Sequence, residues 1–193
     1  PITLSSPLPA NDLLFESMNH SAGLSLLGET QLGLLSEKPD LNALDLLGQS
    51  VTVSVNLRDE GKRHFNGIVS RFGSGTQRGR FFAYQMTLRP WLWFLTRTTD
   101  CRIFQDMTVP DIVKKVFDDH PVANFEFKLF RSYRPWVYCV QYRESDFNFV
   151  ARLLDGTSEI VRAVARDVDH LADRAVRRAA DELRGKIDRA GER

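Results

Sequence analysis

The residues best suited to chemistry are the run Asp118-Asp119-His120 and the two carboxylates Glu144 and Asp146. The run could ligate a metal or act as an acid–base group, and the carboxylates could work as a pair. Each also has a plainer interpretation. Residues 118–120 precede Pro121 at the expected end of a helix, which favours a solvated last turn. Glu144 and Asp146 flank Ser145 at an expected helix start, where the helix dipole favours acids.

The other reactive side chains lack the spacing that catalysis or metal binding requires. Ser145 stands in no G-x-S-x-G motif. Cys101 and Cys139 form no CxxC motif, so two buried thiols are favoured, with a disulfide between them as the alternative. The histidines share no metal-ligand spacing; they are His20, His64, His120 and His170. We therefore expect no enzyme, no catalytic residue, no cofactor and no metal ion.

Two further patterns could indicate binding. Trp91 and Trp93 could stack on sugars or bases, but at alternate positions of an expected strand they would point the same way and pack in a core. Gly73, Gly75 and Gly79 do not fit GxGxxG, and no Gly-Lys-Ser/Thr follows them. We therefore expect a plain hairpin loop there.

Composition limits the classes of function. The 193 residues hold 26 basic and 25 acidic side chains, a net charge of +1 without a long Lys/Arg run, so a nucleic-acid partner is not expected. The hydrophobic fraction of 42% suffices for one or two cored domains. We expect no transmembrane helix and no ordinary signal peptide, because the chain lacks a run of about 18 apolar residues and a basic-then-apolar N-terminus.

Residues 1–100 are expected to form an antiparallel β-barrel. Strands are predicted at 51–57, 65–72 and 80–88, where apolar and polar residues alternate, and another at 24–35, interrupted by glycines. Turns are expected at 59–62 and 73–76. The strand at 80–88 has one clear apolar face: Phe82, Tyr84, Met86 and Leu88.

Residues 101–154 are expected to form a smaller β-α-β-β-α unit. A short strand lies around Ile103, and strands are predicted at 124–130 and 136–142. Thr108 is the expected N-cap of the first helix, and Ser145 opens the second. The buried stripe of the first helix is Ile112, Val113, Val116 and Phe117. That of the second is Phe147, Val150, Leu153 and Leu154.

Residues 155–193 are expected to form a long amphipathic helix. Its apolar positions recur every three or four residues, and Ala and Arg dominate it. The stripe is thin, so the helix needs a partner surface for stability. The predicted fold class is therefore α+β: a barrel, a small α+β unit and a long C-terminal helix.

Seven short segments resemble motifs of the VgrG family, whose members are tip (spike) proteins of bacterial type VI secretion machines. They occur in the family's order at residues 46–53, 64–69, 88–95, 101–106, 109–112, 142–147 and 149–154. The most distinctive reads Leu88-Arg89-Pro90-Trp91-Leu92-Trp93-Phe94-Leu95.

This resemblance implies a structural role and a fold similar to the hub protein of contractile phage tails. It further implies a homotrimer that sits on the Hcp tube, possible effector or adaptor partners, assembly in the bacterial cytoplasm and secretion by the type VI route. Three alternatives remain: a phage baseplate hub protein, a delivery module whose helical tail binds a partner or carries toxicity, and a small hydrolase.

The sequence departs from the family in two places. Residues 20–25 match the family's start only loosely, and residues 155–158 lead into the Ala/Arg helix where family members continue with an aromatic-rich strand. The second barrel and the spike have no counterpart. We therefore expect a chain that cannot act as a complete tip and whose α+β unit exposes apolar surface.

Overall fold

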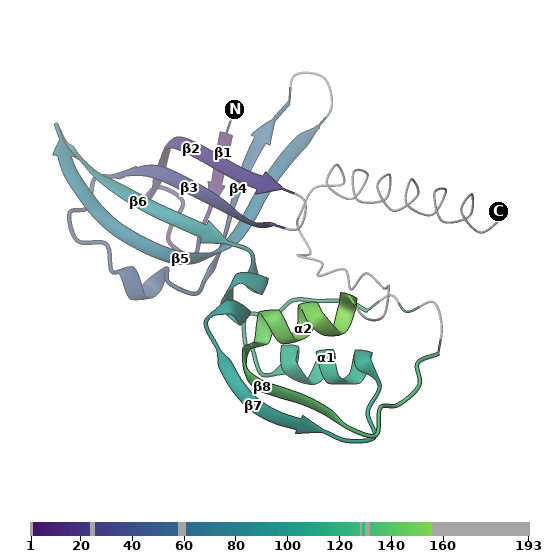
Figure 1. Cartoon of the computed structure of the whole chain (residues 1–193). Coiled ribbons are helices and arrows are strands. Elements are labelled where there is room, and N and C mark those ends of the chain that lie inside the picture. The colour runs from purple at the N-terminus through teal and green to yellow at the C-terminus, as the bar shows by residue number, and fades with distance from the viewer. Residues whose placement is uncertain (1, 24–25, 58–60, 128, 130–131, 156–193) are drawn as a thin grey trace.

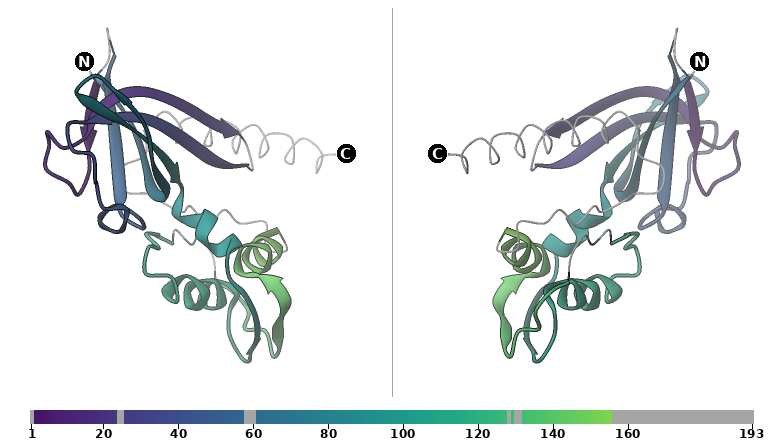
Figure 2. Two further views of the ribbon diagram at one scale, coloured as in Figure 1. Left: turned by 90° about the vertical axis from the view of Figure 1, so that its left-hand side faces the viewer. Right: turned by 90° about the vertical axis from the view of Figure 1, so that its right-hand side faces the viewer.

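The computed structural model describes residues 2–23, 26–57, 61–127, 129 and 132–155. Two lobes are visible: a curled sheet, and a smaller lobe in which two helices lie on a two-stranded ribbon (Figures 1 and 2). The helical tail expected at residues 155–193 lies outside the described residues beyond Asp155. No helix in the described part of the chain is long and apolar enough to cross a membrane.

The first lobe is one antiparallel sheet of six strands in the order β1-β4-β5-β6-β3-β2. Their bounds are β1 Ile2–Ser5, β2 Leu14–Gly23, β3 Leu26–Ser36, β4 Ser50–Asn56, β5 Lys62–Arg78 and β6 Phe81–Arg89. A short 3₁₀ helix, η1 (Ala43–Asp45), joins β3 to β4. The edge strands β1 and β2 form no paired ladder with each other within the described residues. The expected antiparallel β-structure is therefore confirmed, in the form of a curled half-barrel within the described residues.

Alternating side chains build the core of this sheet. Tyr84, Met86 and Leu88 of β6 are buried, and so are Val51 and Val53 of β4. Successive strand residues point to opposite faces, so each strand contributes every second side chain to the core. The predicted strands at 51–57 and 80–88 and the apolar face of the latter are confirmed, within a residue or two of their predicted bounds.

The turn predicted at residues 73–76 is wrong. β5 runs through this segment to Arg78, and the chain reverses at Gly79, whose φ is +62°. The ladder changes register between Ser74 and Gln77, where Gly75 and Thr76 face the single residue Ala83. The glycines thus accompany a bulge inside a long strand, which is a common role of glycine in a strand interior.

The second lobe has the order β-α-β-α. After the 3₁₀ helix η2 (Trp91–Thr96) come β7 (Thr99–Phe104), α1 (Val109–Asp118), β8 (Cys139–Ser145) and α2 (Asp146–Asp155). The strand predicted at 124–130 is wrong, because the described residues there form none. Phe125 and Phe127 pack on Phe117 of α1. The spacing of these two phenylalanines therefore reflects the burial of their side chains, and it does not mark a strand in the described residues.

The first helix forms as predicted. The Thr108 side chain accepts a hydrogen bond from the Asp111 N–H at 3.3 Å and donates one to the Asp111 carboxylate at 2.5 Å. The four predicted stripe residues of α1 are buried, whereas Lys114 and Lys115 are exposed. Thr108 thus satisfies an N–H that has no partner inside the helix.

The strand predicted through Trp91 and Trp93 is wrong. Pro90 cannot donate to a ladder, so β6 ends at Arg89 and the chain turns into η2. Trp91 is buried edge-to-face against Phe117, with ring centroids 4.8 Å apart.

The buried apolar residues form two clusters, one inside the half-barrel and one between the ribbon and the helices of the second lobe. The second cluster begins at Trp91 and Leu95. The division into domains at residue 100 stays a prediction.

Candidate functional site

The structure joins the two acidic motifs of the sequence around Asp146. His120 follows α1 and places its Nε2 atom 2.9 Å from Asp146 Oδ2. Arg102 of β7 places Nη2 2.7 Å from Asp146 Oδ1. Asp146, the first residue of α2, is only 1% exposed. Residues distant in sequence therefore meet at one buried carboxylate.

Two neutral groups complete the shell of Asp146. Gln141 of β8 donates from Nε2 to Oδ1, and the Thr98 hydroxyl donates to Oδ2, both at 2.7 Å. Burial by itself raises the pKa of the Asp146 carboxyl. The hydrogen bonds from Gln141, Thr98 and His120, with the nearby Arg102 charge, outweigh burial and hold the pKa below its usual value. Asp146 is therefore an anion whose acceptor sites are occupied by protein donors.

Arg102 links this cluster to the surface. Its guanidinium lies 2.6 Å from Asp119 and 2.8 Å from Asp100 in addition to Asp146. The solvated turn predicted for residues 118–120 is confirmed at exposed Asp118 and is wrong at His120, whose side chain is 9% exposed. His120 is buried because it has a partner, Asp146, on another element. Sequence spacing does not reveal such a partner.

The predicted capping roles of Glu144, Ser145 and Asp146 are partly wrong. Ser145 Oγ accepts from the Asn148 N–H at 3.2 Å and so caps α2. Glu144 instead pairs with Arg152 at 2.5 Å. None of these contacts activates a hydroxyl for attack, so the arrangement favours a structural role for the cluster over acid–base chemistry.

Sequence reasoning missed Gln141, Arg102 and Thr98. Arg102 stands between Cys101 and Ile103, and Gln141 stands between Val140 and Tyr142. The alternating pattern would therefore place both polar side chains on the exposed face, whereas the structure turns them inward to Asp146. Thr98 carries no signal in the sequence either.

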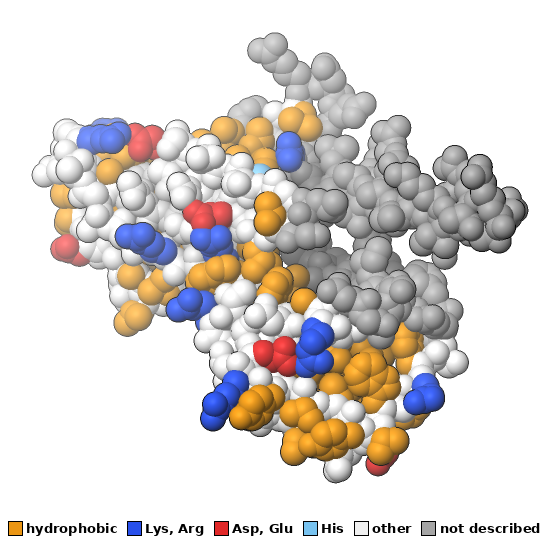
Figure 3. All heavy atoms as spheres, in the orientation of Figure 1, with side chains coloured by type: hydrophobic (Ala, Val, Ile, Leu, Met, Phe, Trp, Pro, Cys, Tyr) orange, Lys and Arg blue, Asp and Glu red, His pale blue; other side chains and the backbone are white. Residues whose placement is uncertain are grey.

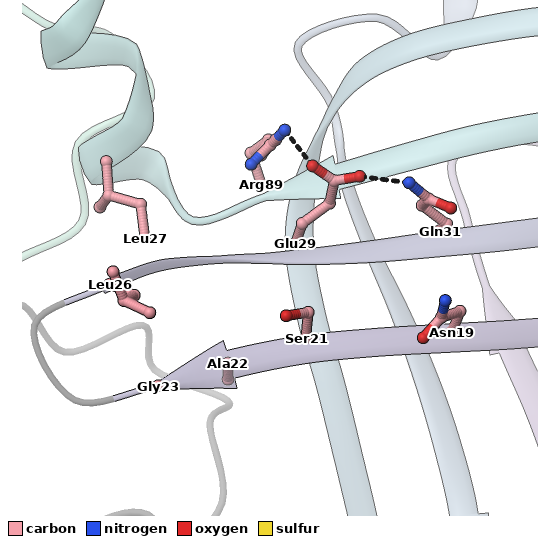
Figure 4. Close-up of a pocket in the computed structure, with 9 residues that line it drawn as sticks. All are labelled: Asn19, Ser21, Ala22, Gly23, Leu26, Leu27, Glu29, Gln31 and Arg89. Carbon is pink, nitrogen blue, oxygen red and sulfur yellow. Dashed lines mark hydrogen bonds and ion pairs between the residues drawn. The ribbon is translucent and has the colours of Figure 1, made fainter.

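A shallow hollow of about 360 Å³ lies beside the tip of the β2–β3 hairpin (Figure 4). Arg89 pairs with Glu29, which also accepts a hydrogen bond from Gln31 at 2.5 Å. The ion pair matches the two opposite charges of the hollow with each other. The lining residues are Asn19, Ser21, Ala22, Gly23, Leu26, Leu27, Glu29, Gln31 and Arg89. Across the described ranges, no group of three or more His, Cys, Asp or Glu side chains could hold a metal ion.

The tryptophans and cysteines divide between core and surface. Trp91 packs in the core as predicted, whereas Trp93 lies partly exposed beneath the guanidiniums of Arg89 and Arg97. Both cysteines are free, but only Cys139 is buried. The predicted burial of Cys101 is wrong, because its position in β7 faces away from the helices.

The β7–β8 ribbon has an apolar outer face, consisting of Cys101, Ile103, Tyr138, Val140 and Tyr142. Ile103 is 61% exposed, and Tyr142 is 65% exposed. Figure 3 shows hydrophobic side chains gathered on the lower lobe, where Figure 1 draws the two strands. The apolar surface expected on this unit is present, and it is the feature of the described chain best suited to protein–protein contact.

Comparison with known proteins identifies the family. Residues 21–158 match the model of the phage tail baseplate hub (GPD) family. Over 154 residues, the chain is 49% identical to the type VI secretion system spike protein VgrG1b of Pseudomonas aeruginosa and 46% identical to VgrG1c of the same organism. The resemblance to VgrG proteins that the motifs indicated is confirmed.

A solved structure has a related fold. It is that of the Escherichia coli c3393 protein, described as a type VI secretion component with structural similarity to the T4 bacteriophage tail proteins gp27 and gp5. The TM-score is 0.56 at 23% identity, over 74% of this chain and 42% of that one. The matched region covers 80% of this chain but only 21% of VgrG1b and of VgrG1c. On the extent of the family match, the chain belongs to the phage tail baseplate hub (GPD) family.

Proposed function

We propose that this chain is a structural tip component of a type VI secretion system, corresponding to the N-terminal part of a spike protein. One observation carries the proposal: 49% identity to VgrG1b over 154 residues, within which the family's motifs recur in order. Identity of this extent to several spike proteins favours a secretion tip over a phage baseplate hub.

In this role the half-barrel is part of a trimeric hub that sits on the Hcp tube, with effector or adaptor proteins as further partners. The hub would assemble in the bacterial cytoplasm and leave by the type VI route. We also propose that residues 1–100 and 101–154 are its two structural units, with residues 155–193 a helical tail foreign to the family. The remainder of a full-length hub would complete the curled sheet as a barrel.

We further propose that the chain has no catalytic role. The closed shell around Asp146 supports this, because protein donors occupy the acceptor sites of its buried carboxylate. In the hollow, the charges of Glu29 and Arg89 are paired with each other. Peptidase or glycosidase turnover abolished by substitution of Asp106, Asp119 or Glu144 would contradict it.

Association with the tube protein tests the tip role. Purified chain is mixed with purified Hcp rings and sedimented, with VgrG1b as positive control and serum albumin as negative control. The expected result is co-sedimentation of the chain with Hcp. Absence of the chain from the Hcp fraction, at concentrations where VgrG1b is retained, would count against the proposal.

A further inference from the structure

We infer that the outer face of the β7–β8 ribbon is a packing surface for the part of a full-length hub polypeptide that lies outside the region matched by this chain. The inference rests on the proposed function and names the partner of this surface: an apolar segment of the same polypeptide. No described residue of this chain covers the face.

The two faces of the ribbon carry different side chains. Cys101 pairs with Tyr142, and Ile103 pairs with Val140, so these four side chains share one face. The intervening residue Arg102 points to the opposite face, toward Asp146. Tyr138 stands two residues before Val140, continues the alternation, and is 56% exposed.

The inner face of the ribbon is buried against the helices. Phe104 is 3% exposed and stacks on Phe149 of α2, with ring centroids 5.6 Å apart, and Gln141 is completely buried. A two-stranded ribbon covered on one side only is unusual unless its other side is polar. Here the other side carries Ile103, Tyr138 and Tyr142, which are residue types typical of a covered surface.

The size of the face indicates which partner fits. Aromatic side chains bury 150–250 Å² each, so the exposed part of this face amounts to on the order of 400 Å². Stable complexes of separate chains bury about 800 Å² on each partner, so two copies meeting through this face alone fall short. A segment of the same polypeptide needs far less area, because its effective concentration is high.

The proportions of the relatives supply such a segment. The matched region accounts for 21% of VgrG1b, so about four-fifths of that protein lies outside it. The family match ends at residue 158, directly after α2. The matched region therefore ends with the second helix of the lobe.

Cys101 is a built-in reporter for this face, because it lies exposed on the face, opposite Tyr142, while Cys139 is buried. Maleimide labelling of Cys101, followed by mass spectrometry of its peptide, is compared in two proteins. One is this chain, and the other is VgrG1b with its matched region replaced by the corresponding residues of this chain. The expected result is labelling at least tenfold slower in the chimera. Equal rates would overturn the inference.

A second pair of variants guards against a misfolded chimera. Tyr142→Lys should leave the melting temperature of this chain unchanged and lower that of the chimera by several degrees. Leu44→Lys is the matched control, because Leu44 is 78% exposed outside the ribbon, and it should leave both unchanged. An equal effect of Tyr142→Lys in both proteins would also overturn the inference.

Other occupants give distinct results. Faster labelling of Cys101 after deletion of residues 158–193 would assign the face to the tail, and labelling that slows with protein concentration would assign it to a second copy. Either result overturns the inference. Co-sedimentation of the chimera with Hcp is scored separately, so a working tip with a reactive Cys101 refutes this inference alone.

Discussion

At the scale of single residues, Asp146 holds the second lobe together. Its carboxylate receives donors from β7, from β8, from His120 two residues beyond α1 and from Thr98 ahead of β7. Four segments therefore depend on one charge for their relative positions. A buried charge of this kind is costly to leave unpaired, so the cluster is sensitive to the loss of any one member.

Replacing Asp146 with Asn should destabilise the chain by about 3 kcal/mol, because Arg102 would lose its buried counter-charge. Urea unfolding followed by tryptophan fluorescence measures this, since Trp91 lies in the same lobe. The control is Asp118→Asn, which removes only an exposed pair with Lys114 and should cost less than about 0.5 kcal/mol. Equal effects of the two variants would show that the buried cluster contributes nothing specific.

The same residue predicts an acid dependence. The pKa of Asp146 is lower in the folded protein than the ordinary value of 3.8, so its ionised form is stabilised by folding. That contribution is present above pH 3.8 and is lost as the pH falls through the lower folded value. The free-energy difference between the wild type and Asp146→Asn should shrink when urea unfolding is repeated below pH 3.8. A difference that grows on acidification would contradict this sign.

At the scale of elements, β5 lies against β6 at the shared motif of residues 64–69. A Cβ at buried Gly67 would lie 2.9 Å from Leu88 Cβ and 3.1 Å from the Arg89 carbonyl oxygen. Gly67→Ala should therefore cost about 1–3 kcal/mol in unfolding free energy. Gly73→Ala in the same strand meets nothing within 4 Å and should change stability by less than about 1 kcal/mol. Comparable losses in the two variants would mean that the close approach at Gly67 is tolerated.

The N-cap of α1 gives a smaller, local effect. Thr108→Ala removes the acceptor for the Asp111 N–H and should lower the unfolding free energy by about 1 kcal/mol. Chemical denaturation resolves a change of this size. A variant as stable as the wild type would mean that water or the Asp111 side chain replaces the cap.

Sequence patterns predicted some elements well and failed on others for identifiable reasons. α1 was predictable because its cap, its stripe and its polar face all point to one helix. The segment 124–130 was not, since alternating phenylalanines report burial and cannot show whether a backbone partner exists. The bulge near Gly75 resembles a turn for a related reason, because glycine suits both.

The polar cluster was the least predictable feature. His120 and Asp146 each have an ordinary local explanation at a helix terminus. Only the packing of α1 against α2 and the ribbon brings His120 Nε2 to 2.9 Å from Asp146 Oδ2. No local sequence pattern predicts that contact. Family motifs located the fold, but they gave no role to Arg102 or Gln141.

At the scale of the whole molecule, the described residues form a half-barrel joined to a lobe whose ribbon has one face packed on the helices and one apolar face that no described residue covers. The chain spans about a fifth of VgrG1b. Under the proposed function, the role of the chain lies in contacts with other protein surfaces.

The proposed hub role is tested by the mass in solution of VgrG1b that carries this chain's residues in place of its matched region. Multi-angle light scattering gives the number of subunits for the chimera and for unmodified VgrG1b under the same conditions. We expect the same number of subunits for both proteins, with three as the expected value. A monomeric chimera beside an oligomeric VgrG1b would contradict the claim that this chain is a hub component.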